Sequence, residues 1–170
     1  MKKRVLAACA FAFVAACMKQ PPPPDPAITA KRDVQLALER WQKAFEAKDV
    51  NGVMAVYAPG ASLIAYDVVP PLQYKGLDAY RKDYGELFAQ FDGPLHIDFR
   101  DTHLEAGNNL AVAYGLEHIT GKLKTGRPVD IWVRYTSVFK HIDDRWLDIH
   151  DHVSVPADLD TGKAMLDLRP

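Results

Sequence analysis

Residues 145–156 alternate between apolar and polar side chains, which is the pattern of a β-strand whose two faces meet different surroundings. One face is mostly apolar but contains one carboxylate; it consists of Leu147, Ile149, Asp151, Val153 and Val155. The other face carries an indole, a carboxylate, two imidazoles and a hydroxyl, from Trp146, Asp148, His150, His152 and Ser154. This strand is therefore the first place to look for chemistry.

The rest of the pattern predicts helices first and strands afterwards. Apolar residues at helical spacing indicate a helix over about 29–48, a short helix after Asp49, and a third between Gly76 and Asp92. Two short strands are expected at 61–67 and 72–75, and three long ones at 95–104, 110–122 and 129–142. Because short turns join the long strands, they must be antiparallel neighbours. The expected class is α+β, with a curved, mostly antiparallel sheet wrapped over three helices of the N-terminal half.

The first residues have the layout of a secretory signal. Lys2, Lys3 and Arg4 precede a short apolar segment over 5–14, too short for a permanent membrane span. The sequence Val-Ala-Ala-Cys at 14–17 resembles the lipobox of bacterial lipoproteins, which implies cleavage before Cys17 and lipidation of that residue. A simple secretory signal that contains a cysteine is the alternative. The resemblance implies a protein of the bacterial cell envelope, lipid-anchored and facing the periplasm or the exterior.

The expected organisation has four parts. A lipoprotein signal covers 1–16, and the lipidated Cys17 with a proline-rich linker covers 17–28. One folded domain covers 29–156, and a tail covers 157–170. Cys9 leaves with the signal, so the folded domain contains no cysteine for a disulfide.

Composition excludes some classes of function. The 170 residues carry a formal net charge of −1, without the clustered basic face that a nucleic-acid-binding protein shows. Nucleophile elbows, phosphate loops and dinucleotide fingerprints are absent from the sequence. No nucleic-acid partner and no cofactor are expected.

The order of several short motifs resembles the SnoaL-like branch of the NTF2-like superfamily, which includes ketosteroid isomerase homologues. The motifs are Trp41-Gln42-Lys43-Ala44-Phe45, Tyr57-Ala58-Pro59-Gly60-Ala61, Gln73-Tyr74-Lys75-Gly76, Asp92-Gly93-Pro94, Trp132-Val133-Arg134, and Arg145-Trp146 leading into residues 150–156. The resemblance implies a cone-shaped barrel with a pocket between the concave sheet and the helices, and frequent homodimers through the sheet. It does not imply one activity. The tyrosine and aspartate pattern of the isomerases is not matched to particular positions.

The two faces of strand 129–142 leave two arrangements open. Ile131, Val133, Tyr135, Ser137 and Phe139 share one face, and Trp132, Arg134, Thr136 and Val138 share the other. Either the apolar face is the core, or the mixed face lines the pocket and a dimer covers the apolar one. We expect the second arrangement, because tryptophan is usually well buried and each mixed face carries one.

The candidate site residues follow from that choice. Arg134 would hold an anionic or carbonyl oxygen, Trp132 would form an apolar wall, and His152 and Tyr114 would contact the ligand. Asp67 and His150 are the candidate acid–base groups, since burial raises the pKa of a carboxyl and histidine titrates near neutrality. Asp98 is a weaker candidate. Alternatively, Arg134 pairs with Asp148 or Asp67 and the histidines complete a structural network.

A metal site is a further alternative. His150 and His152 lie on one strand face, and His96, Glu117 or Asp67 could supply a third ligand, but no local spacing does so. No metal is therefore expected. The sequence predicts a domain that binds a small, partly apolar ligand, with metal-independent acid–base chemistry of an isomerase or lyase. A non-catalytic ligand-binding or structural dimeric module of the envelope is the alternative.

Overall fold

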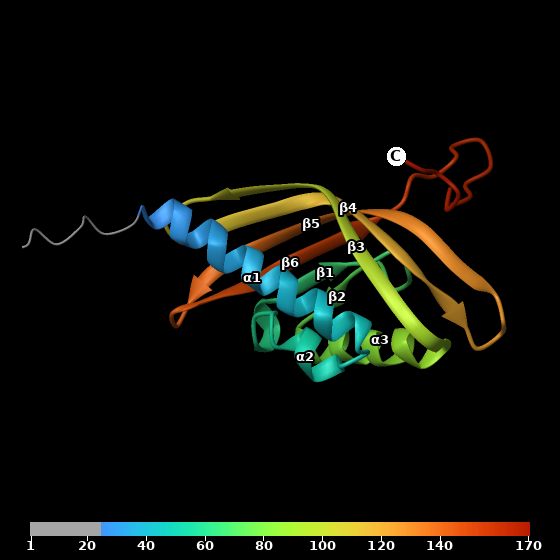
Figure 1. Ribbon diagram of the computed structural model, residues 1–170, viewed down its shortest axis with the longest axis horizontal. Helices are drawn as coiled ribbons and strands as arrows, with labels where there is room; N and C mark the ends of the chain where they lie inside the picture. The colour runs from blue at the N-terminus through green and yellow to red at the C-terminus, as the bar shows by residue number, and fades with distance from the viewer. Residues whose placement is uncertain (1–24) are drawn as a thin grey trace, which may run out of the picture.

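The computed structural model describes residues 25–170, which form three α-helices and one six-stranded sheet (Figure 1). The expected class, α+β with a curved sheet over helices, is confirmed. The signal, Cys17 and most of the proline-rich linker lie outside the described residues. Within 25–170, no helix combines the length and hydropathy needed to cross a membrane.

Helix α1 (Pro26–Glu46) begins three residues before the expected start at Thr29. The Asp25 side chain accepts a hydrogen bond from the Ala27 N–H at 2.9 Å, and proline suits the first helical position because its missing N–H is not needed there. Asp49 caps α2 (Val50–Met54) in the same way, as the sequence predicts. Helix α3 (Leu77–Gln90) follows Gly76, whose φ of 85° favours glycine.

The sheet has the strand order β2-β1-β6-β5-β4-β3. Its short strands are β1 (Ile64–Tyr66) and β2 (Tyr74–Lys75); its long strands are β3 (Phe91–Ala106), β4 (Leu110–Leu123), β5 (Pro128–Ile142) and β6 (Arg145–Ser154). All neighbours are antiparallel except β1 and β6, which run parallel. The long strands bend around the helices, which gather on the concave side (Figure 1).

The core lies between the concave face of the sheet and helices α1 and α3. Each helix contributes a buried stripe at helical spacing: Val34, Ala37, Trp41 and Phe45 from α1, and Tyr80, Tyr84 and Phe88 from α3. The aromatic rings pack edge to face, as between Phe45 and Phe88 with centroids 5.4 Å apart. The aromatic residues of the third helix are therefore core residues.

The expected orientation of β5 is wrong. Val133, Tyr135, Ser137 and Phe139 are buried on the concave face, whereas Trp132 and Arg134 lie on the convex face. Trp132 is partly covered there because it stacks on His118, with ring centroids 4.4 Å apart and planes at 4°, under the Arg100 guanidinium. Side chains of the neighbouring strands β4 and β3 thus shield Trp132 from solvent, and its burial does not require a pocket.

A β-bulge at Ile149 resets the alternation of β6. Phe139 pairs with Asp148, but the next residue, Val138, pairs with His150, so Ile149 is an extra residue on its strand. Asp148 and Asp151 consequently both lie on the concave side, opposite the buried Phe139 and Ser137. Simple alternation would put these two carboxylates on opposite faces.

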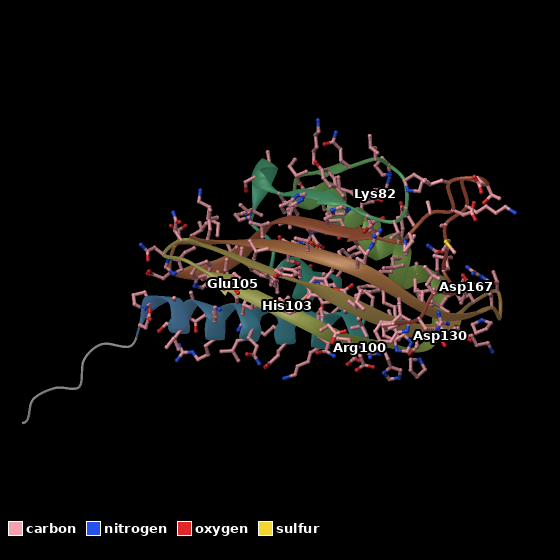
Figure 2. The ribbon with its side chains drawn as sticks, turned by 90° about the horizontal axis from the view of Figure 1, so that it is seen from above. Lys82, Arg100, His103, Glu105, Asp130 and Asp167 are labelled. Atoms are coloured by element: carbon pink, nitrogen blue, oxygen red, sulfur yellow. The ribbon has the colours of Figure 1, made fainter. Side chains whose placement is uncertain are left out.

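The expected tail folds back beside the sheet. The Met165 N–H donates to the Pro156 carbonyl at 2.9 Å, and Arg169 reaches the Asp130 carboxylate of β5 at 3.3 Å. Figure 2 shows Asp130 and Asp167 near each other at this end of the molecule, far from the start of α1. The same view labels Arg100, His103 and Glu105 along β3.

Candidate active site

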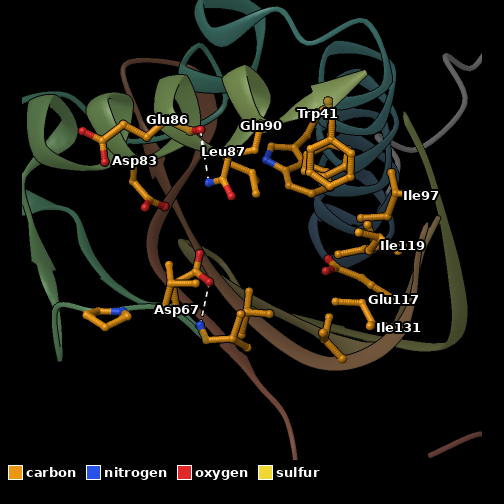
Figure 3. A pocket seen from close by; sticks show the side chains of 18 residues that line it. Trp41, Asp67, Asp83, Glu86, Leu87, Gln90, Ile97, Glu117, Ile119 and Ile131 are labelled. Carbon is orange, nitrogen blue, oxygen red and sulfur yellow. Dashed lines mark hydrogen bonds between the residues drawn. The ribbon is translucent and has the colours of Figure 1, made fainter. Parts of the chain in front are cut away.

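A cavity of about 260 Å³ opens between the concave sheet, the loop after β1 and helix α3 (Figure 3). Most of its wall is apolar: Trp41, Phe45, Val68, Val69, Pro70, Leu87, Phe91, Ile97, Ile119, Val129, Ile131, Val133 and Val153. Its polar groups are Asp67, Asp83, Glu86, Gln90 and Glu117. Apolar walls with a few polar groups are typical of small-molecule sites.

Glu117 lies inside this cavity on β4. The alternation that buries Ala111 and Ala113 also turns Glu117 inward, beside Val133 of β5, and leaves the residue 6% exposed. Its carboxyl points into the cavity (Figure 3), and no fully buried side-chain oxygen or nitrogen among the described residues lacks a hydrogen-bond partner. Burial raises the pKa of Glu117 well above its usual range, with smaller contributions from Asp151 and Asp67, so its surroundings favour the protonated acid.

Asp67 lies at the other side of the cavity, directly after β1 (Figure 3). The Val68 N–H donates to its Oδ1 at 2.6 Å, and the Tyr80 hydroxyl lies 3.5 Å from Oδ2. Burial, followed by the charges of Asp83 and Asp151, raises the pKa of Asp67 to about 6. Asp67 is therefore ionised at neutral pH but takes up a proton readily, which is what a general base requires.

Helix α3 brings a third carboxylate to the cavity, on the side facing Asp67 (Figure 3). The Tyr74 hydroxyl donates a hydrogen bond to Asp83 Oδ1 at 2.7 Å and also lies 2.8 Å from the Pro70 carbonyl oxygen. Burial raises the pKa of Asp83, although the Tyr74 hydrogen bond opposes the shift. This tyrosine links the α3 side of the cavity to the loop that carries Asp67.

Beneath the cavity, Asp151 sits in a cluster of hydroxyl groups. Tyr57 and Tyr80 each donate to Asp151 Oδ2 at 2.9 Å, and Ser137 donates to Oδ1 at 3.3 Å. The Trp41 indole N–H donates in turn to the Tyr57 oxygen at 3.1 Å. These donors stabilise a charge that has no cationic partner among the described residues.

Asp148 and Asp151 form a pair. Burial raises the pKa of both, and the charge of Asp151 raises that of Asp148 further. Because three hydroxyls donate to Asp151, the negative charge of the pair is favoured on Asp151 and the proton on Asp148. A void of about 10 Å³ lined by both carboxyls also touches Glu117, so the pair lies next to the cavity acid.

Of the six residues expected at the site, Asp67 lines the cavity and the other five do not. Trp132, Arg134 and Tyr114 lie on the convex face; Tyr114 is 42% exposed and stacks on His103. Arg134 makes no salt bridge within the described residues, so it does not pair with Asp148 or Asp67. Asp98, the weaker candidate, is exposed on β3.

The two histidines of β6 also lie on the convex side. His150 Nδ1 is 2.9 Å from the Ile64 carbonyl oxygen, and the edge of Tyr66 contacts both imidazoles. His152 lines an open groove that Asp67 also borders. No three potential metal ligands among the described residues lie close enough to share an ion.

Sequence reasoning considered Glu117 only as a metal ligand and named neither Asp83 nor Asp151 as a site residue. The sequence contained a signal for Glu117 and Asp151. Glu117 follows the inward alternation of β4, and Asp151 lies on the apolar face of β6, so each is a carboxyl at a core position. For Asp83 no sequence signal was available, because its role depends on the loop that α3 faces.

The chain was compared with known proteins. Residues 34–158 match the model of the SnoaL-like domain. A crystal structure of an NTF2-like protein of unknown function from Pseudomonas putida KT2440 has 28% identity and a TM-score of 0.77, covering 85% of this chain and 99% of the other. No protein in the set with curated functions matches the chain.

Two more distant structures share the fold. One is an NTF2-like superfamily protein from Salmonella enterica, with 18% identity, a TM-score of 0.70 and coverage of 81% and 99% of the two chains. The other is named as a dehydratase candidate of the NTF2-like family from Streptomyces avermitilis, with 19% identity, a TM-score of 0.66 and coverage of 75% and 97%. Since the matched model spans most of the folded domain, this chain belongs to the SnoaL-like family of the NTF2-like superfamily.

Proposed function

We propose that the domain binds a small, largely apolar molecule in the cavity and catalyses a metal-independent proton transfer of the isomerase or lyase type. Asp67 is the base and Glu117 is the acid. The observation that carries the proposal is Glu117: its carboxyl faces an apolar cavity from a residue that is 6% exposed, and a second carboxyl lies across that cavity. A carboxyl with a strongly raised pKa in an apolar cleft is a candidate for proton transfer.

The different surroundings of Glu117 and Asp67 give the two carboxyls different roles in the proton transfer. Burial raises the pKa of Glu117 and favours its protonated form, which can donate its proton to a carbonyl or hydroxyl oxygen of the ligand. Asp67 has a pKa of about 6 and is ionised at neutral pH, so it can accept a proton from a carbon next to that oxygen. This replaces the expected catalytic pair of Asp67 and His150, because His150 lies on the convex side. The likeness to a dehydratase candidate is compatible with this chemistry.

The test uses 2-tetralone, a neutral bicyclic ketone with acidic hydrogens beside its carbonyl. In D₂O, removal of such a hydrogen by Asp67, while Glu117 donates to the enolate oxygen, and return of deuterium gives a labelled ketone that mass spectrometry detects. We expect the folded domain to accelerate exchange, Asp67→Asn to abolish the acceleration, and Glu117→Gln to reduce it roughly 100-fold. Glu105→Gln, an exposed carboxyl change on β3, is the control.

The alternative is a non-catalytic ligand-binding or structural module. It is favoured if 2-tetralone shifts the NMR signals of cavity residues such as Ile119 and Val133 but exchanges no faster than in buffer. Absence of both binding and exchange would contradict the proposed function altogether.

We also propose that the protein acts at the bacterial cell envelope, facing the periplasm or exterior, through lipidation of Cys17. The support is the sequence alone: a basic segment, an apolar segment and the Val-Ala-Ala-Cys motif at 14–17. We also propose a homodimer, but not through the surface that the sequence suggested. The apolar face of β5 that a dimer was expected to cover is the core, so the contact would have to use the convex face.

A further inference from the structure

The ionisable side chains that line the cavity within residues 25–170 are all carboxyls. Asp67, Asp83, Glu86 and Glu117 line it, and no lysine, arginine or histidine among residues 25–170 does so. Glu86 lies 3.7 Å from Lys82, on the exposed side of α3. The carboxyls of Asp67, Asp83 and Glu117 have no such cation.

Glu117 lies apart from the other carboxyls of the cavity wall. Its carboxyl belongs to a residue that is 6% exposed and lies at the side of the cavity opposite Asp67 and Asp83 (Figure 3). Two carboxyls, those of Asp67 and Asp83, therefore face each other at the side closed by the loop after β1 and by α3. Ile97, Ile119 and Ile131 flank Glu117 and make its side of the cavity apolar (Figure 3).

Asp67 and Asp83 repel each other. The charge of Asp83 raises the pKa of Asp67, and Asp151 from β6 adds to the effect, while the Val68 N–H and the Tyr80 hydroxyl oppose it. A ligand cation between the two carboxylates would remove that repulsion. A ligand anion there would add a third negative charge in a partly desolvated place, where charges interact more strongly than in water.

Cations do occur nearby, but outside this cavity. Arg127 and Arg169 line an adjoining groove of about 510 Å³ that shares Val129 and Ile131 with the cavity. Arg169 is already paired with Asp130 at 3.3 Å. An anion could therefore be attracted to the groove without entering the cavity.

We propose that the cavity selects its substrate by charge: it accepts a neutral or cationic molecule, best an apolar amine, and rejects an anion of the same shape. This inference rests on the proposed function and names the substrate class for the same site. The ammonium group lies between Asp67 and Asp83, and the apolar body extends towards Glu117. This replaces the expectation that Arg134 holds an anionic or carbonyl oxygen of the ligand, because Arg134 lies on the convex face.

The test uses three probes that share a naphthyl body: 1-naphthylmethylamine, 1-naphthylmethanol and 1-naphthoate. Near pH 7.5 they are a cation, a neutral molecule and an anion. Titration calorimetry with the folded domain should give an affinity for the amine at least tenfold higher than that for the carboxylate, with the alcohol between them. Asp83→Asn keeps an acceptor for Tyr74 and should weaken the amine about tenfold while leaving the alcohol unchanged.

Asp78→Asn is the matched control, because it removes one exposed carboxylate of the same helix that does not line the cavity. It should change neither affinity. Equal affinities for the three probes, preference for the carboxylate, or no binding of any probe while 2-tetralone exchange proceeds would overturn the charge inference and leave the proposed function standing. Preferred amine binding, lost in Asp83→Asn, without any tetralone exchange would support the charge inference and count against the catalysis.

Discussion

Asp148 and Asp151 are three residues apart on β6, yet both carboxyls are buried on the concave side of the sheet, with 3% and 5% of each residue exposed. The bulge at Ile149 makes this possible. Two carboxyls in one desolvated place cannot both ionise cheaply. The pair therefore favours sharing one proton, with the negative charge on Asp151 beneath the cavity, where that charge raises the pKa of both Glu117 and Asp67.

Replacing Asp67 with asparagine should make the folded state more stable at neutral pH. The folded pKa of about 6 lies above the ordinary value of 3.8, so between these values the folded state binds more protons than the unfolded state. Stability consequently falls as pH rises through this window, by roughly 3 kcal/mol in total. Urea unfolding near pH 7.5 should show Asp67→Asn more stable than the parent by up to about this amount.

At low pH the stability difference between Asp67→Asn and the parent should vanish. Below pH 3.8 the Asp67 carboxyl is protonated in both states, so the gain from asparagine should disappear. Asp78→Asn, at an exposed position, serves as the control. A gain from Asp67→Asn that is the same at both pH values would contradict the raised pKa.

Replacing Tyr57 with phenylalanine should destabilise the fold by about 1–3 kcal/mol, because a buried hydrogen-bond network loses its centre. The hydroxyl donates to Asp151 and accepts from the Trp41 indole N–H, so its removal leaves both partners short of a hydrogen bond. Tyr66→Phe, which removes an exposed hydroxyl, should change stability by less than about 0.5 kcal/mol. Thermal and urea unfolding of both variants tests the network; equal effects would argue against it.

Replacing Val133 with glutamate should unfold the domain at every protein concentration. Val133 is 1% exposed and lies on the concave face, so the change buries a charge without a partner. Under the opposite orientation of β5, the variant would fold and only a dimer would weaken. Circular dichroism and sedimentation separate the two outcomes.

The neighbouring substitution Arg134→Met is the control for that orientation. Arg134 is exposed and makes no ion pair within the described residues, so this change should alter stability by less than about 0.5 kcal/mol. A loss of several kcal/mol would instead mean that a buried carboxylate had lost its partner.

Replacing Cys17 with serine should release the protein from the membrane fraction or block its processing. The reason is that serine has no thiol to carry the lipid, and stable membrane attachment requires acyl chains. Fractionation after expression in a bacterium with lipoprotein processing measures the effect. Mass spectrometry that finds an unmodified mature N-terminus at another residue would contradict the anchor.

The elements of the fold could be predicted because their signals are local. Asp49 caps α2, and short turns join the long strands, so their order and antiparallel pairing follow from the sequence. The predicted start of α1 is three residues too late, because the sequence pattern assigns Pro26 to a linker. Proline at the first position of a helix is compatible with both interpretations.

The site was harder to predict because it depends on which face of the sheet is concave. Both faces of β5 contain large apolar residues, and Trp132 owes its cover to His118 on the neighbouring strand, a contact that no single-strand pattern reveals. The bulge at Ile149 added a second difficulty, since strict alternation separates Asp148 from Asp151. Asp67 does line the cavity, as the sequence predicts, because it lies at a strand end, where orientation matters less.

The extra residue at Ile149 also affects how relatives should be aligned. A homologue whose last strand lacks the bulge needs a one-residue gap at this position; without the gap, every residue on one side of Ile149 would be matched to a neighbour on the wrong face. Carboxyls equivalent to Asp148 and Asp151 would then look variable in an alignment although they occupy the same space. Searches for this site in other genomes should therefore match positions through strand pairing with β5, where Ser137 and Phe139 mark the two places.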